Sequence, residues 1–154
     1  MPTSRTLHIL VGTVTNTAEY VAQAIELDCA DLVDHIEVRL MDDLGPSVFS
    51  AGALYIICTS TFGEGDVPDN ARALYDALDR PGLRLDGVRY GVIALGDSVY
   101  PQTFCNGGRR FDERLASLGA QRVGERLCLD ASTEREPEAR GAAWCRTWLA
   151  EALA

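Results

Sequence analysis

Short apolar runs alternate with longer amphipathic segments along the whole chain. Most of the runs are largely apolar, which favours strands buried on both faces of a parallel sheet. The run at residues 35–40 instead alternates apolar and polar side chains, as expected of an edge strand with one wetter face. The predicted strands cover residues 7–11, 35–40, 53–59, 89–95 and 123–129.

The longer segments place apolar side chains three and four residues apart, the spacing of a helix with one buried face. In residues 16–29, for example, Ala18, Val21 and Ile25 follow this spacing, and Pro137 suits the first turn of the last helix. The segment between the second and third strands has room for a short or irregular helix. The predicted helices cover residues 16–29, 69–79, 104–118 and 137–153.

This alternation predicts an α/β fold in a single domain over residues 1–154. We expect a doubly wound, five-stranded parallel sheet in the order 2-1-3-4-5, with helices on both faces. Ligands of such sheets bind beyond the carboxyl ends of the strands, near the point where the strand order reverses. Functional residues are therefore expected just after strands one, three, four and five.

The composition excludes several kinds of chemistry. All 14 basic side chains are Arg, so the Lys of a P-loop NTPase, a pyridoxal phosphate enzyme or a protein kinase is absent. Two histidines are too few for a multi-His metal site, and no metal is expected. The net charge of −9 disfavours nucleic acid and anionic membranes and favours a basic protein partner.

Five widely spaced cysteines contain no C-x-x-C pair, which disfavours zinc ribbons and thioredoxin-type motifs. Cys58 and Cys128 lie in apolar runs and are predicted to be small core residues, and Cys105 is also expected to be a core residue rather than a redox-active one. Residues 1–6 are too short and polar for a signal peptide, and no apolar run approaches 18 residues. These features predict a cytoplasmic, reduced protein.

The segment after the first strand combines hydroxyls and an amide at the start of a helix. Thr13, Thr15, Asn16 and Thr17 fall within it. Backbone N–H groups at a helix start carry partial positive charge and suit a phosphate, to which the hydroxyls add neutral donors. The alternative is ordinary capping of the helix by Thr13 or Thr15.

Two further loops carry glycines and aromatic residues. Gly63 and Gly65 flank Glu64 after the third strand, next to Phe62, and glycine permits backbone conformations that a Cβ would hinder. A simple turn is the alternative for this Gly-Glu-Gly sequence, and Asp69 or Asn70 is also expected to cap the next helix. After the fourth strand, Tyr100 offers a face for stacking on a planar ligand or a cover for an apolar patch.

Together the three loops resemble the flavodoxin family, in particular the branch shared by MioC-type flavodoxins and the FMN domains of diflavin reductases. The matching motifs are TVTNTAE at 13–19, STFGEGD at 60–66 with PDN at 68–70, and LGDSVY at 95–100 with TFC at 103–105. The resemblance covers residues 6–150. The family usually has Gly at the position of Asn16, and Asn is the next most tolerant residue for left-handed backbone.

The resemblance implies an FMN-binding electron-transfer protein without a substrate of its own. The FMN phosphate would bind to the first loop, Tyr100 would stack on the outer flavin face, and Phe62 would lie near the inner one. The peptide at Gly63 would flip to offer a carbonyl to the protonated flavin N5, while nearby acids would disfavour full reduction. The implied cofactor contacts are Thr13, Val14, Thr15, Asn16, Thr17, Ala18, Ser60, Thr61, Phe62, Gly63, Glu64, Gly65, Leu95, Gly96, Asp97, Tyr100, Phe104, Cys105 and Asp130.

The expected partners are redox proteins with basic surfaces. The donor would be similar to a flavodoxin/ferredoxin NADP reductase, acceptors would include biotin synthase, and the protein would be a monomer. Segments 41–46, 63–69, 97–104 and 130–138 together hold ten carboxylates and one Arg, which predicts an acidic docking face at the flavin edge. Two alternatives are an FMN-dependent NAD(P)H:quinone reductase of flavodoxin fold and a flavin-less interaction module.

Overall fold

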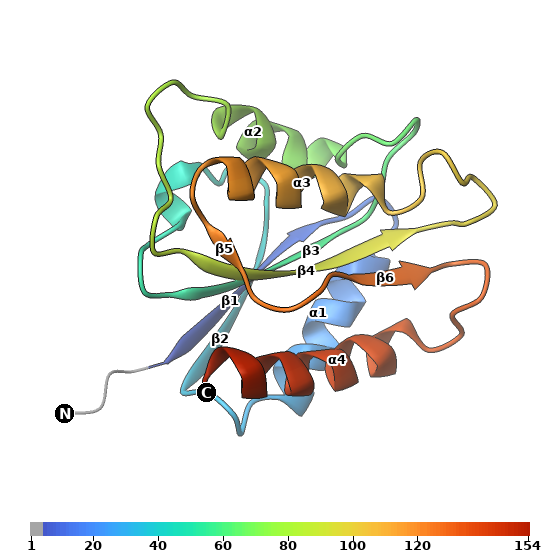
Figure 1. The fold of residues 1–154 in the computed structure, drawn as a ribbon. Coiled ribbons are helices and arrows are strands. Elements are labelled where there is room, and N and C mark those ends of the chain that lie inside the picture. The colour runs from blue at the N-terminus through green and yellow to red at the C-terminus, as the bar shows by residue number, and fades with distance from the viewer. Residues whose placement is uncertain (1–4) are drawn as a thin grey trace.

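The computed structural model describes residues 5–154, which form a parallel sheet with helices on both faces (Figure 1). The strands pair in the predicted order, β2-β1-β3-β4-β5, and β6 also pairs with β4. β1, β3 and β4 are almost wholly buried, whereas β2 is mostly exposed, as its alternating pattern predicted. The strands are β1 Thr6–Gly12, β2 His35–Leu40, β3 Leu54–Thr59, β4 Arg89–Gly96, β5 Gln121–Arg122 and β6 Leu127–Asp130.

Each face of the sheet has its own hydrophobic core. α1 and α4 cover one face, and α2 and α3 cover the other (Figure 1). The predicted irregular helix is a single 3₁₀ turn, η1. The helices are α1 Thr17–Asp28, η1 Pro46–Val48, α2 Asp69–Ala77, α3 Asn106–Ser117 and α4 Pro137–Ala152. Among residues 5–154, no helix is long and apolar enough to cross a membrane.

The fifth position of the sheet differs from the prediction of one strand over residues 123–129. This position holds two short strands, β5 and β6, which both pair with β4. Between the two pairings, residues 123–126 lie opposite only two residues of β4, residues 91–92. The indole N–H of Trp148 donates to the Val123 carbonyl at 2.9 Å, in place of a strand partner. The indole also needs Gly91, because a Cβ there would lie 2.5 Å from its nitrogen. Gly124, with φ 68°, marks this bulge in the sequence.

Cys128 is the clearest error in the predicted core. Cys58 and Cys105 are buried as expected, but Cys128 is exposed. In β6, Leu127 and Leu129 turn into the core against α1 and α4, so Cys128 between them faces the opposite side. That side is open because β6 is an edge strand, and an apolar run at an edge is buried on only one face.

Candidate functional site

The first loop joins β1 to α1 and is closed by its own residues. The Asn16 backbone N–H donates to the Thr13 hydroxyl oxygen at 2.8 Å. Asn16 has φ 69°. This is the left-handed conformation expected at a position where the family that the sequence resembles usually has Gly. Asn16 is also the residue that precedes the helix, and its side chain makes no capping bond. Thr13 therefore shapes the loop and does not cap α1.

The start of α1 presents unpaired backbone donors. Within residues 5–154, the N–H groups of Thr15, Thr17 and Ala18 donate to no protein acceptor. The first N–H groups of a helix lack partners inside the helix, and here no side chain replaces them. Their partial positive charge fits a phosphate, which supports the predicted anion site over capping.

Asn70 anchors the first loop from α2. Its amide oxygen accepts the Thr13 N–H at 2.9 Å, and its amide nitrogen donates to the Val11 carbonyl at 3.1 Å. The same nitrogen contacts an Asp42 carboxylate oxygen at 3.2 Å. The predicted capping role for Asp69 or Asn70 is therefore wrong, because Pro68 precedes α2 without a side-chain cap and Asn70 reaches across to the loop instead.

The second loop, residues 62–66, is a tight hairpin. The backbone N–H and carbonyl of Phe62 pair with those of Asp66, each bond 2.8 Å long. Gly63 and Gly65 have φ values of 52° and 101°, so the turn uses the left-handed region at both glycines. The backbone geometry here agrees with the need for glycine that the sequence suggested.

Asn106, at the start of α3, anchors the second loop although it is not part of that loop. This side chain is more than nine-tenths buried, and its amide nitrogen donates to the Gly65 carbonyl. Its amide oxygen accepts from Arg109 Nε at 2.7 Å. A Cβ on Gly65 would lie 2.9 Å from the Asn106 nitrogen. Sequence reasoning missed Asn106, although it directly follows the motif at 103–105.

Asp66 has cationic partners that the sequence did not reveal. Its carboxylate binds Arg72 of α2 and lies 3.2 Å from Arg110 of α3. Arg72 lowers the pKa of Asp66 through a hydrogen bond, against an opposing effect of burial. Asp66 belongs to the acidic segment 63–69, but its carboxylate is paired with cations and is not a free negative charge. Two arginines outside the acidic segments offset that charge.

The third loop, residues 97–104, is tied to the end of β6. One Asp130 oxygen accepts the Ser98 N–H at 3.0 Å, and it also accepts the Ser132 N–H at 3.0 Å and its hydroxyl at 2.8 Å. These bonds, those from Ser98 first, lower the pKa of Asp130. Thr61 links this region to the second loop, because its hydroxyl donates to the Leu95 carbonyl and accepts the Gly107 N–H, both at 3.0 Å.

The edge of the three loops carries exposed apolar side chains. Tyr100 is 63% exposed and Phe62 is 42% exposed, and Val14 and Val99 are also exposed. Each of the three loops thus contributes at least one uncovered apolar side chain, which suits a planar apolar ligand. Some predicted contacts could reach such a ligand only through their backbone, because their side chains are buried, namely Ala18, Ser60, Leu95 and Cys105.

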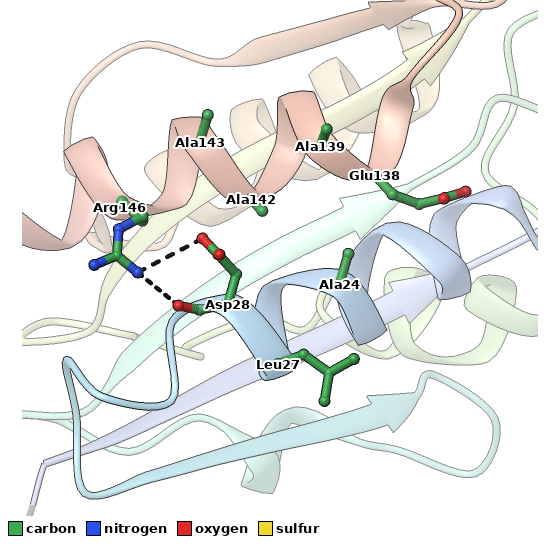
Figure 2. Close-up of a pocket in the computed structure, with 8 residues that line it drawn as sticks. All are labelled: Ala24, Leu27, Asp28, Glu138, Ala139, Ala142, Ala143 and Arg146. Atoms are coloured by element: carbon green, nitrogen blue, oxygen red, sulfur yellow. Dashed lines mark hydrogen bonds and ion pairs between the residues drawn. The ribbon is translucent and has the colours of Figure 1, made fainter.

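Two hollows lie away from the three loops. One, of about 570 Å³, runs between α1 and α4 and is walled largely by alanines (Figure 2). There Arg146 reaches across from α4 to the Asp28 carbonyl at 2.6 Å and its carboxylate at 3.6 Å. The other, of about 1120 Å³, lies near the amino ends of β1 and β3. Neither is at the carboxyl edge of the sheet where ligands of this fold bind.

Comparison with known proteins settles the family. A family model described as flavodoxin matches residues 9–144. The chain belongs to the flavodoxin family. This confirms the predicted family, its fold and its function as an FMN-binding electron-transfer protein, and neither the quinone reductase nor the flavin-less alternative is favoured.

Relatives agree with the predicted branch. The chain is 39% identical over 140 residues to flavodoxin YqcA of Pectobacterium carotovorum subsp. carotovorum, covering 91% of this chain and 92% of that one. It is 31% identical over 144 residues to protein MioC of Escherichia coli O157:H7, covering 92% and 94%. It is 34% identical over 137 residues to the sulfite reductase [NADPH] flavoprotein alpha-component of Bacillus subtilis (strain 168), covering 88% of this chain and 22% of that one.

Solved structures give the same result. A point mutant of flavodoxin from Pseudomonas aeruginosa superposes with a TM-score of 0.81 at 33% identity, covering 97% of this chain and 99% of that one. With the relatives above, this likeness indicates that the partners of the protein are other redox proteins.

Proposed function

We propose that the three loops hold FMN and that the protein carries electrons from a reductase to acceptor enzymes. One observation carries this proposal. Unpaired N–H groups at the start of α1 and the exposed rings of Phe62 and Tyr100 lie at the same edge of the sheet. A phosphate and a planar apolar ring are the two parts of FMN that these features fit. When bound, FMN supplies the ability to take up and release single electrons.

The first loop binds the phosphate without a cationic side chain. The N–H groups of Thr15, Thr17 and Ala18 donate to it, and the threonine hydroxyls add further donors. Asn16 keeps the chain in the left-handed turn that aims these groups outward, and Asn70 holds Thr13 in place. Binding by neutral donors agrees with a chain that contains no Lys.

The second and third loops hold the ring. Tyr100 would cover the outer face of the ring and Phe62 would lie near the inner face, and both would exclude water from it. Glu64 and Asp97, which have no cationic partner among residues 5–154, disfavour additional negative charge on the ring. The Gly63 peptide would be placed to offer its carbonyl to the ring, because a glycine tolerates both orientations of the peptide.

The acidic edge docks basic redox partners. We propose a donor similar to a flavodoxin/ferredoxin NADP reductase, acceptors that include biotin synthase, and a monomeric carrier. Asp42, Asp97 and the acids that follow β6 supply the attraction, which weakens as salt rises. All five cysteines are free, which favours work in the reducing cytoplasm.

Titration of the apoprotein with FMN tests the proposal, with quenching of flavin fluorescence as the readout. We expect one FMN per chain, and we expect Tyr100→Ala to weaken binding roughly tenfold because the stacking surface is lost. Leu27→Ala is the matched control, since Leu27 is 84% exposed on α1 away from the loops. Failure of the chain to take up FMN, or equal affinity of the Tyr100 and Leu27 variants, would contradict the proposal.

A further inference from the structure

Two cysteines lie against the same residue at the edge of the sheet. Cys128 of β6 is the partner of Ala94 in the pairing of β6 with β4. The Cys105 thiol donates to the Ala94 carbonyl oxygen at 3.4 Å. Ala94 and Cys105 belong to the core under α2 and α3, and Cys128 faces this same side of the sheet. Their shared neighbour Ala94 therefore places the two cysteines next to each other.

The two thiols have opposite environments. Cys105 is 4% exposed, whereas Cys128 is open to solvent. The contact with Cys105 lowers the pKa of Cys128 to about 6, and nearby Arg126 acts in the same direction. The same contact and burial raise the pKa of Cys105. An exposed thiolate beside a buried thiol is the arrangement in which cysteine oxidation is site-selective.

The other cysteines provide an internal comparison. Cys29, directly after α1, and Cys145, within α4, also interact, but both are completely buried. Cys58 is completely buried in β3, and burial raises its pKa to about 12. Of the five cysteines, only Cys128 is open to solvent, so an oxidant dissolved in water reaches it first.

We propose that Cys128 and Cys105 form a peroxide-reactive thiol site, with Cys128 as the nucleophile and Cys105 as the resolving thiol. The Cys128 thiolate attacks hydrogen peroxide, the O–O bond breaks, and a sulfenic acid forms while the released hydroxide takes up a proton to give water. Cys105 sulfur then attacks the sulfenic sulfur, an S–S bond forms, and a second water leaves with the Cys105 proton. The two thiols lose two electrons and one peroxide is reduced to two waters.

The disulfide would tie down the third loop. Cys105 directly follows this loop, and its backbone packs so closely against Gly96, the residue before the loop, that no Cβ fits on Gly96. Asp130, two residues after Cys128, already binds the loop at Ser98. A covalent bond from β6 to Cys105 adds a second restraint to the loop that carries Tyr100. This consequence rests on the proposed FMN site, and we expect oxidation to slow FMN release.

The chemistry is tested on the full-length protein treated with a small excess of hydrogen peroxide, then blocked with N-ethylmaleimide and analysed by mass spectrometry. We expect loss of two thiols and one cross-linked peptide pair that contains Cys105 and Cys128. Cys128→Ser should abolish the reaction, Cys105→Ser should leave a dimedone-reactive sulfenic acid at Cys128, and Cys145→Ser should react like the native chain. A disulfide between other cysteines, only intermolecular disulfides, or no dimedone adduct would overturn the assignment.

The rate of FMN release gives a second readout. We expect release from the oxidised protein to be roughly threefold slower than from the reduced protein, reversed by dithiothreitol and absent in Cys128→Ser. An unchanged rate despite the disulfide would refute the effect on the loop but not the proposed function. A chain that binds no FMN would refute the proposed function, and the mass analysis would still decide on the thiol chemistry.

Discussion

The first and second loops lie side by side at the carboxyl edge of the sheet, but they are completed in different ways. The first loop leaves the N–H groups of Thr15, Thr17 and Ala18 without protein partners. The second loop pairs Phe62 with Asp66 and receives further bonds from Asn106 and Arg72. The first loop therefore has N–H donors left for an anion, whereas the second loop is completed by groups of the protein itself. Changes in the first loop should alter ligand affinity, and changes in the second should alter the free energy of unfolding.

The largest expected effect is on the second loop, through Gly65→Ala. Position 65 has φ 101°, and the new Cβ would lie 2.9 Å from the buried Asn106 nitrogen. We expect a loss of about 3 kcal/mol in the free energy of unfolding of the apoprotein, measured with urea. Gly63→Ala is the matched control, because it has φ 52° and open space around it, and should cost about 1 kcal/mol. Equal losses in the two variants would show that Asn106 does not anchor the loop.

An intermediate effect is expected on the first loop, through Asn70→Ala. This change removes the acceptor of the Thr13 N–H and the donor to the Val11 carbonyl. We expect FMN affinity to fall roughly tenfold, which corresponds to about 1.4 kcal/mol, because the phosphate-binding N–H groups lose their fixed position. Asn106→Ala should instead cause a larger loss in the free energy of unfolding than in the free energy of FMN binding. If the two variants show the same ratio of affinity loss to stability loss, the contrast between the loops is wrong.

The smallest effect concerns the pH dependence of stability. Since Arg72 lowers the folded-state pKa of Asp66, the carboxylate stabilises the protein at neutral pH and loses this contribution as pH falls through that pKa. Unfolding by urea between about pH 5 and pH 2 should show a shallower decline for Asp66→Asn than for the native chain. Glu64→Gln has no such partner, and its decline should match that of the native chain. Identical curves for all three would show that the Asp66 ion pair contributes nothing.

The sequence predicted what local patterns determine. Buried runs located the strands, and the residues at their carboxyl ends located the three loops, including left-handed backbone at Asn16. It did not predict the contacts between distant segments. Asn70 reaches Thr13 and Asn106 reaches Gly65 across more than forty residues of chain. The exposure of Cys128 depends on an edge position, and the break before β6 depends on Trp148, so neither follows from the apolar run itself.

The most direct test of the account compares FMN with riboflavin, which has the same ring but no phosphate, on the apoprotein. If the unpaired N–H groups of the first loop bind the phosphate, riboflavin should bind at least about 100-fold more weakly than FMN. Fluorescence titration at fixed ionic strength gives both dissociation constants. Equal affinity for the two compounds would contradict the account, because the open first loop would then make no contribution to binding.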